Sequence, residues 1–381
     1  MLAVLLVVIL LFWLLVGAQL VPGLYRLENL EHVQTTSAEP FVSVIIAARN
    51  EEAAIESALR SQVAQRYQHV EWIVVNDRST DRTGDLLERF SASNPRIQPI
   101  HVKQLPNGWL GKNHALYTGY QHAKGDLLLF MDADVLMEPD CLQKAVSYLS
   151  SEQADHITVL PNLTASGIWL TSFIGHFLFS FTYLIRPWKA NDDHSKVGLG
   201  IGAFNLIAKT AYEKMGTHKA IRMRPDDDLQ LGMKVKEAGL RQRVVSGSAM
   251  LRVHWYSTLR EAFIGLEKNT FAAYNYRLWL VAFSITALFL FHVLPYLALL
   301  FSSGLQQLFS LGSVLAISLL YGITLKKTTA YSLFHVPLFP FAAALLICSI
   351  VRTMILVFKR GGIVWRGTLY SLRELREQQN K

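Results

Sequence analysis

The chain has 381 residues, too many for one ordinary small domain, and 51% of them are hydrophobic. Its net charge of +8 comes without the interleaved basic and aromatic residues, or the zinc-finger spacing, of a nucleic-acid-binding protein. The two cysteines, Cys141 and Cys348, lie far apart, so neither a disulfide framework nor a cysteine metal site is indicated.

The first apolar segment lies at the N-terminus. Leu2 to Val21 contains no charged residue and is long enough to cross a bilayer as a helix. No basic residue precedes it, which favours a retained anchor over a cleaved signal peptide. We therefore expect residues 1–22 to be a transmembrane anchor.

Residues 25–277 have the mixed composition of a soluble domain, and strands alternate with helices in its first half. This alternation predicts a mostly parallel sheet with helices on its faces, and ligands at the carboxyl edge of the strands. The predicted strands are Val42–Ala47, Val70–Val75, a short one within 97–104, and Leu127–Met131; predicted helices include Glu52–Gln65 and one over 111–125.

Three predicted strands end in polar signatures: Arg49-Asn50-Glu51, Asn76-Asp77 and Asp132-Ala133-Asp134. Right-handed connections place all three at one edge of the sheet. The glycine fingerprint of dinucleotide sites and the P-loop are both absent. Bare carboxylates repel phosphate, so a phosphate ligand here requires a bridging cation, for which oxygen ligands favour Mg²⁺ or Mn²⁺. An Asp-rich turn without a ligand is the alternative.

A second apolar run, "GIWLTSFIGHFLFSFTYLI", interrupts this domain over residues 167–185. If it crossed the membrane, the two halves of the domain would lie on opposite sides. We therefore expect residues 167–186 to form an interfacial helix, with a buried core helix as the alternative.

An acidic run, Asp226-Asp227-Asp228, precedes a helical pattern in "RPDDDLQLGMKVKEAGL". Acidic residues are favoured at a helix N-terminus, so capping accounts for at least one of them. Three exceed the need of a cap, and the spare carboxylate can act as a general base on a hydroxyl.

Three further apolar segments follow within residues 278–358: Leu278–Ser302, Leu308–Ile323 and Val336–Phe358. They predict three membrane helices, followed by a basic amphipathic tail over 359–381 that suits anionic headgroups on the cytoplasmic side. Four crossings would put the N-terminus and the tail on the same side. The positive-inside rule instead places the N-terminus outside, so either one segment is re-entrant, through Pro337 and Pro340, or the count is wrong.

Four motifs resemble glycosyltransferase family 2, the inverting enzymes with a GT-A fold. They are "VSVIIAARNEEAAI", "EWIVVNDRSTDRT", "GDLLLFMDADV" and "RPDDDLQLGMKVKEAG". Ala47 replaces the usual proline of the first motif, and Asn76 and Arg78 replace the Asp and Gly of the second. The resemblance implies an α/β GT-A fold, with a mostly parallel sheet and flanking helices, plus transmembrane helices.

Three more elements resemble the membrane-bound, lipid-modifying branch that includes carotenoid, hopanoid and ceramide glycosyltransferases. These are "LPNGWLGKNHAL", "GLEKNTFAA" and "GGIVWRGTLYSLRELR". The Q-x-x-R-W motif of processive synthases is missing, since Leu278 separates Arg277 from Trp279 in the nearest string. This favours transfer of a single sugar.

On the donor side, the resemblance implies that Glu51 and Asp77 hold the nucleotide base and ribose. It also implies that Lys112 contacts the diphosphate and that Trp109 packs on the donor. The alternatives are helix capping, an Asx-turn, an exposed helix-start lysine and core packing, respectively.

On the metal side, the resemblance implies that Asp134 coordinates the cation and that Asp132 reaches the ribose or the metal shell. Asp228 is the implied catalytic base, with Asp227 before it in the motif.

The resemblance thus implies an enzyme that transfers one sugar from a nucleotide-diphosphate donor, a UDP-sugar such as UDP-glucose, to a lipid acceptor, with Mg²⁺ or Mn²⁺. It would reside in a bacterial cell membrane with its catalytic domain in the cytoplasm. The alternatives are a polyisoprenyl-phosphate glycosyltransferase or processive polysaccharide synthase, and a non-catalytic scaffold.

Overall fold

The computed structural model describes residues 1–36, 39–274, 277–365 and 368–371, and the last ten residues of the expected basic tail lie outside this range. The chain forms two compact units. The sheet unit comprises residues 26–163 and 187–254. The helical unit comprises residues 1–25, 164–186 and 255–381.

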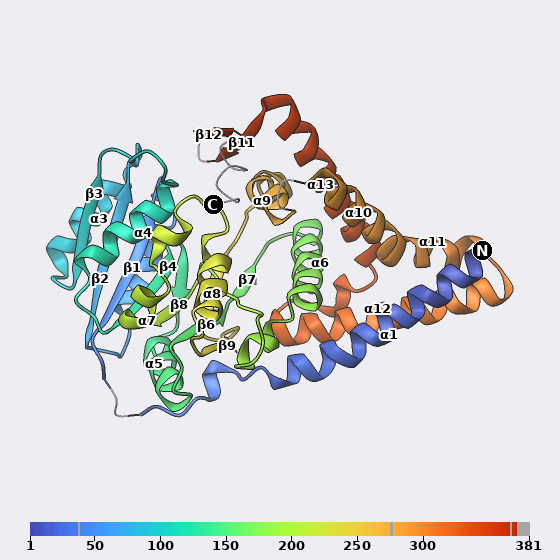
Figure 1. The fold of residues 1–381 in the computed structure, drawn as a ribbon, viewed down its shortest axis with the longest axis horizontal. Coiled ribbons are helices and arrows are strands. Elements are labelled where there is room, and N and C mark those ends of the chain that lie inside the picture. Colours follow the sequence, from blue (N-terminus) through green and yellow to red (C-terminus); the bar gives the residue numbers. More distant parts are fainter. Residues whose placement is uncertain (37–38, 275–276, 366–367, 372–381) are drawn as a thin grey trace. The chain divides into compact units, whose positions relative to one another are not determined.

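A seven-stranded, mostly parallel sheet is the centre of the sheet unit (Figure 1). Its strand order is β3-β2-β1-β4-β8-β6-β9, and only β8 runs antiparallel to its neighbours. The strands are β1 Val42–Ala48, β2 Val70–Asp77, β3 Ile97–Val102, β4 Leu127–Asp132, β6 His156–Leu160, β8 Asn205–Ala208 and β9 Gln242–Ser246.

Both faces of this sheet are buried, which explains why its strands read as unbroken apolar runs. Val44 and Ile46 of β1 pack in one hydrophobic cluster with α2, α3 and α5, whereas Ile45 packs in a second cluster with α4, α7 and α8. The helices are α2 Ile55–Val63, α3 Thr83–Ser93, α4 Gly111–His122, α5 Cys141–Ser151, α7 Lys209–Lys214 and α8 Asp227–Glu237.

The strand register brings the polar strand ends together. In β1, Ala47 is paired with Asp132 of β4, and Ala48 is paired with Asn76 of β2. The ends of β2 and β4 therefore lie at one edge, on either side of β1, as the alternation of strands and helices predicts.

Shorter elements complete the fold. A second sheet has the order β5-β10-β7, and a hairpin follows α13. These strands are β5 Val135–Met137, β7 Asn162–Thr164, β10 Leu251–His254, β11 Gly362–Trp365 and β12 Thr368–Ser371. Single 3₁₀ turns cover Leu30–His32, Pro187–Asn191, His218–Ile221 and Leu333–His335.

The helical unit consists of seven helices and one π-helical turn in the described part of the chain. They are α1 Leu2–Arg26, α6 Ile168–Ile185, α9 Leu259–Ala273, α10 Leu278–Leu288, the π turn Phe289–Val293, α11 Leu294–Phe301, α12 Gly304–Thr328 and α13 Phe339–Arg360. Counting α10 to α11 as one span, five of these segments are long and apolar enough to cross a membrane. Membrane association follows from this composition.

Helices α1 and α12 pack side by side and run parallel. Leu10 lies against Gly312, and Leu320 lies against Gly17, where a Cβ would come within 3.1 Å of it. Near the C-terminal ends, the Lys327 ammonium lies 4.0 Å from the centre of the Tyr25 ring. The three contacts advance together along both helices, so the two C-terminal ends lie at the same level.

Candidate active site

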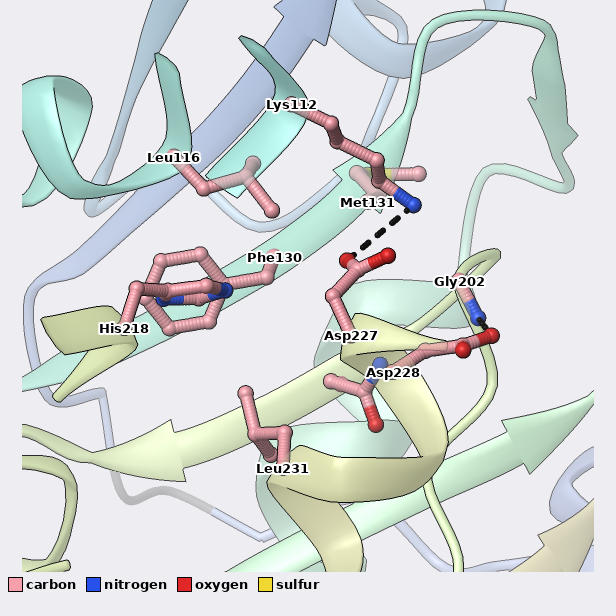
Figure 2. A pocket seen from close by; sticks show the side chains of 10 residues that line it. Lys112, Leu116, Phe130, Met131, Gly202, His218, Asp227, Asp228 and Leu231 are labelled. Atoms are coloured by element: carbon pink, nitrogen blue, oxygen red, sulfur yellow. Dashed lines mark hydrogen bonds and ion pairs between the residues drawn. The ribbon is translucent and has the colours of Figure 1, made fainter. Parts of the chain in front are cut away.

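Charged side chains from three elements meet at the carboxyl edge of the sheet, and Figure 2 shows two of them, Lys112 and Asp227. The Nζ atom of Lys112, at the start of α4, lies 2.8 Å from Oδ1 of Asp132 and 3.3 Å from Oδ2 of Asp227. Asp132 ends β4, and Asp227 begins α8 with a side chain only 6% exposed. Lys112 and Asp227 share a pocket whose lining is Lys112, Leu116, Phe130, Met131, Gly202, Asn205, His218, Asp227, Asp228 and Leu231.

Lys112 is the cation at the centre of this pocket. Burial by itself would lower the pKa of Lys112, but the carboxylates of Asp132, Asp227 and Asp228 outweigh it and raise that pKa above its ordinary value. Lys112 therefore carries its charge at every physiological pH.

Asp228 is held by the backbone on the other side of the pocket. Its Oδ2 accepts a hydrogen bond from the Gly202 N–H at 2.8 Å, and its Oδ1 accepts one from the Leu229 N–H at 2.9 Å. Gly202 in turn accepts a hydrogen bond through its carbonyl from the Asp132 N–H at 2.9 Å. Through these two hydrogen bonds, Gly202 connects Asp228, the candidate general base, to the end of β4.

The third acid of the run points elsewhere. Arg224 donates through Nε and Nη2 to the two carboxylate oxygens of Asp226, at 2.9 and 2.8 Å. Gln230 also donates to Asp226, at 2.8 Å. Among the three consecutive acids, Asp227 and Asp228 line the pocket. Asp226 is the N-cap residue of α8 but makes no side-chain capping hydrogen bond, so the expected capping is wrong for this residue.

Asp134 lies in a region of concentrated negative charge. Burial, reinforced by the carboxylates of Asp132 and Glu51, raises the pKa of Asp134 to about 7. The Glu51 backbone N–H donates to Thr83 Oγ1 at 2.8 Å, which fixes the turn after β1 beside α3.

These carboxylates suit a divalent cation that takes only one or two of its ligands from the protein. No group of three or more His, Cys, Asp or Glu side chains in metal-binding geometry occurs among the described residues. Mg²⁺, however, is commonly held by one or two carboxylates together with substrate phosphates. Asp132 and Asp134 are the residues that would hold the ion.

Asp77, at the end of β2, is buried and is held by the residue that follows it. Arg78 donates through Nε and Nη2 to the two carboxylate oxygens, at 2.7 and 3.0 Å, and Arg49 lies 3.9 Å away. Arg78 has a φ of 56°, in the left-handed region where the resembling motif has glycine. Its place at the end of a predicted strand singled out Asp77, but no sequence pattern predicts this bidentate pair.

Trp109 packs against α4. Its ring stacks on Tyr117 at a centroid distance of 5.3 Å and meets His114 edge-on at 5.6 Å. His114 Nδ1 is buried without a hydrogen-bond partner in the described structure. These contacts are the core packing that was the alternative for Trp109, and its contact with the donor stays a prediction.

Several pocket residues were not anticipated from the sequence. His218 accepts or donates through Nδ1 to the Tyr212 hydroxyl at 2.6 Å, and burial together with Lys112 lowers its pKa to about 3. No local pattern marks His218. The glycines within 198–202, in contrast, are a signal of close backbone approach, and Gly198 and Gly200 lie against the backbone of Gly232 and Asp228.

Comparison with known proteins agrees with this geometry. Residues 43–216 match the family model Glycosyl transferase family 2. The chain is 31% identical over 208 residues to the probable glycosyltransferase YdaM of Bacillus subtilis (strain 168), covering 52% of this chain and 47% of that protein. It is 34% identical over 122 residues to the 4,4'-diaponeurosporenoate glycosyltransferase of Staphylococcus haemolyticus (strain JCSC1435), covering 32% of each. The matches thus span a third to a half of these relatives.

The fold comparison extends over more of the chain. The mannosyltransferase PcManGT from Pyrobaculum calidifontis, solved with GDP-Man and Mn²⁺, aligns with a TM-score of 0.52 and 17% identity over 92% of this chain and 99% of that one. The expected α/β fold class is confirmed, and residues 43–216 match the family 2 model that the four motifs resemble.

Proposed function

We propose that the chain is a membrane-bound, inverting glycosyltransferase that moves one sugar from a nucleotide-diphosphate donor to a lipid acceptor. One observation carries the proposal: Lys112, Asp227 and Asp228 line one pocket at the carboxyl edge of the sheet, where Lys112 also pairs with Asp132, in the region that matches the family 2 model. Relatives named as glycosyltransferases, one of them acting on a carotenoid acid, support the reaction class.

Asp228 is suited to take the proton from the acceptor hydroxyl. Its carboxylate lines the pocket, and the Gly202 N–H fixes its orientation. As the hydroxyl oxygen attacks the anomeric carbon, the bond to the diphosphate breaks on the opposite face, which inverts the anomeric centre. The proton passes to Asp228.

Lys112 is suited to stabilise the departing diphosphate, because its ammonium is permanently charged and lies beside Asp132. A Mg²⁺ or Mn²⁺ ion held by Asp132 and Asp134 would supply further charge stabilisation for that leaving group. Mn²⁺ in the aligned mannosyltransferase supports a divalent cation.

A hydrophobic acceptor fits a chain with long apolar helices, since the lipid stays in the bilayer while its polar group meets the water-soluble donor. The relatives named for diaponeurosporenoate point to such a lipid. A UDP-sugar, with UDP-glucose as the first choice, is the donor we propose, and the cytoplasmic face of a bacterial membrane is the proposed location of the site.

A screen with purified protein tests the proposal. UDP- and GDP-sugars are offered with carotenoid, hopanoid and ceramide acceptors, and products are identified by mass spectrometry. We expect one acceptor to gain a single hexose. A polymeric product, or a polyisoprenyl-phosphate sugar, would point to the alternative classes, and no product from any pair would contradict the proposal.

The matched variants are Asp228→Asn and Asp226→Asn, two neighbours of which only Asp228 lines the pocket. Loss of a general base lowers the rate by roughly 10²- to 10⁴-fold. We expect Asp228→Asn to lose transfer to this extent and to keep donor binding, whereas Asp226→Asn keeps activity. Equal rates in the two variants would remove Asp228 from the reaction.

A further inference from the structure

We infer that α13 does not cross the membrane: it begins inside the bilayer and leaves on the side where α12 ended. The chain then crosses three times, in α1, in α10 to α11, and in α12. This inference concerns the bilayer as a partner and does not depend on the proposed sugar transfer.

The three spans define the two membrane faces. Parallel packing puts the C-terminal ends of α1 and α12 at one face, marked by Tyr25 and Lys327. Only Ser302 and Ser303 join α11 to α12, so these two helices form a hairpin whose turn lies at the opposite face. The start of α10, at Leu278, is consequently on the same face as the end of α12.

The first residue of α13 lies within the span. The buried Phe339 ring is stacked on His292 at 5.3 Å and lies 5.1 Å from Tyr321. His292 belongs to the π turn between α10 and α11, and Tyr321 is two turns before the end of α12. At 1.5 Å per residue, Tyr321 is about 10 Å inside the last residue of α12.

The buried contacts of α13 then give its direction. Its first residue lies beside the π turn, but further along, Ile350 and Val357 share a buried cluster with Val281, close to the start of α10. Helix α13 therefore runs back along α10 toward the face where α12 ends. Its 22 residues are about 33 Å long, roughly three times the distance of about 10 Å between the level of Tyr321 and the end of α12.

The charged residues of α13 agree with this path. Glu267 of α9, with a side chain only 4% exposed, lies 3.5 Å from Arg352 and 2.9 Å from Arg360. If α13 crossed the bilayer, Arg352 would lie about two turns inside the hydrocarbon, where a charge is costly. On the inferred path, the second half of α13 lies at headgroup level, and all three charges with it.

The distribution of basic residues assigns the sides. Arg26, Lys326 and Lys327 are in the last turns of α1 and α12, and Lys359 and Arg360 are in the last turn of α13. The opposite face has the uncharged turn Ser302-Ser303. By the positive-inside rule, the basic face is cytoplasmic and the N-terminus is outside. Three crossings satisfy this rule, whereas four cannot.

Helix α6 does not add a crossing on this path. Both of its ends lead directly into the sheet unit, at residues 163 and 187. The sheet unit also follows the C-terminal end of α1, which lies at the basic face. The inferred topology therefore puts the sheet unit on the side where nucleotide sugars are made.

Cysteine labelling tests the inference. The background is Cys141→Ser with Cys348→Ser, into which Ser303→Cys, Lys326→Cys or Lys359→Cys is introduced singly; all three positions are exposed. Intact bacterial cells are treated with a membrane-impermeant maleimide, with and without permeabilisation. We expect Ser303→Cys to react in intact cells, and Lys326→Cys and Lys359→Cys to react only after permeabilisation.

Reaction of Lys359→Cys in intact cells, together with Ser303→Cys, would overturn the inference, because α13 would then cross. Labelling of Lys326→Cys and Lys359→Cys without Ser303→Cys would overturn the orientation. Fusions after Lys381 of the otherwise unchanged chain report the side of its C-terminal end without any substitution that could cause misfolding. We expect a green fluorescent protein fusion to fluoresce and an alkaline phosphatase fusion to be inactive. Neither readout requires sugar transfer, so failure of the proposed function is distinguishable.

Discussion

Single carboxylates at the edge of the sheet differ in the groups that hold them. Asp132 pairs with Lys112 and Asp77 pairs with Arg78, whereas burial, together with the charges of Asp132 and Glu51, raises the pKa of Asp134. A carboxylate surrounded by other carboxylates gains most from a divalent cation. Asp134 is therefore the residue whose loss should affect metal binding most.

We expect Asp134→Ala to abolish the metal-dependent part of UDP binding, a loss on the order of a hundredfold in affinity. Titration calorimetry with and without Mn²⁺ measures it. Asp140→Ala is the control, since Asp140 pairs with Arg66 at 2.9 Å outside the pocket. Unchanged Mn²⁺ dependence in Asp134→Ala would exclude this residue as a ligand.

A buried histidine makes the stability of the sheet unit depend on pH. His156 is fully buried; Gln242 donates to its Nδ1 at 2.8 Å, and its Nε2 lies 3.2 Å from Asn205 Oδ1. Burial lowers the pKa of His156 from 6.5 to about 4. The unfolded chain therefore binds this proton more readily, and stability present above pH 6.5 is lost as the pH falls toward 4.

At pH 5 the loss attributable to His156 is about 2 kcal/mol. Thermal unfolding in detergent at pH 7 and pH 5, for wild type and His156→Gln, measures it. We expect the decline between the two pH values to be smaller in the variant by about this amount. An identical decline would show that His156 does not titrate on unfolding.

Residue-level expectations from the sequence depended on spacing along the chain. The alternation of strand residues places Asp132 and Asp134 together, and the order of strands places Asp77 near them. The pairing of Lys112 with Asp227, 115 positions later, depends on how α8 packs against the sheet. No local pattern contains that information, which is also why His218 was missed.

At the scale of elements, a close backbone contact positions α8. A Cβ on Gly232 would lie 2.1 Å from the Leu199 carbonyl carbon and 2.4 Å from the Gly200 nitrogen. Backbone atoms cannot rotate away, so a larger residue must push the helix from the segment that holds Gly202. The geometry of Asp228 depends on this contact, because its hydrogen bond joins α8 to Gly202.

We expect Gly232→Ala to destabilise the protein by roughly 1–3 kcal/mol and to lower transfer activity with it. Gly322→Ala is the matched helical control, since its nearest neighbour would be 3.6 Å away. Thermal unfolding and the product assay measure the two effects. If Gly232→Ala had the same stability and activity as the control, the close contact of α8 would not determine the geometry of Asp228.

Periodicity predicted strands β1 to β4 and helices α2 and α4 of the sheet unit to within three residues, because each is buried on a regular face. Helix α2 begins at Ile55, three residues later than expected, since Glu51 to Ala54 form a turn closed by a 3.0 Å backbone hydrogen bond. The sequence did not predict the path of α13 through the bilayer, because an apolar sequence predicts affinity for the bilayer but not how deeply the helix lies in it. That depth is determined by contacts with neighbours such as His292.

For the whole molecule, three crossing helices should make membrane attachment resistant to extraction of peripheral proteins. We expect the chain to remain in the pellet after washing membranes with alkaline carbonate, and to be released only by detergent. Immunoblotting of both fractions measures it, with a known peripheral protein as control. Release by carbonate alone would contradict the existence of crossing helices.

The consecutive acids at the start of α8 have one further consequence. Successive residues of a helix point in directions that differ by about 100°. The three adjacent aspartates therefore bind three different partners: an arginine, a lysine and a backbone amide, respectively. Deleting one of the three would leave a similar sequence, "PDDL", but would change the helix position of the remaining acids and therefore the partner toward which each one points. The three side chains are chemically identical, whereas their positions on the helix are not equivalent.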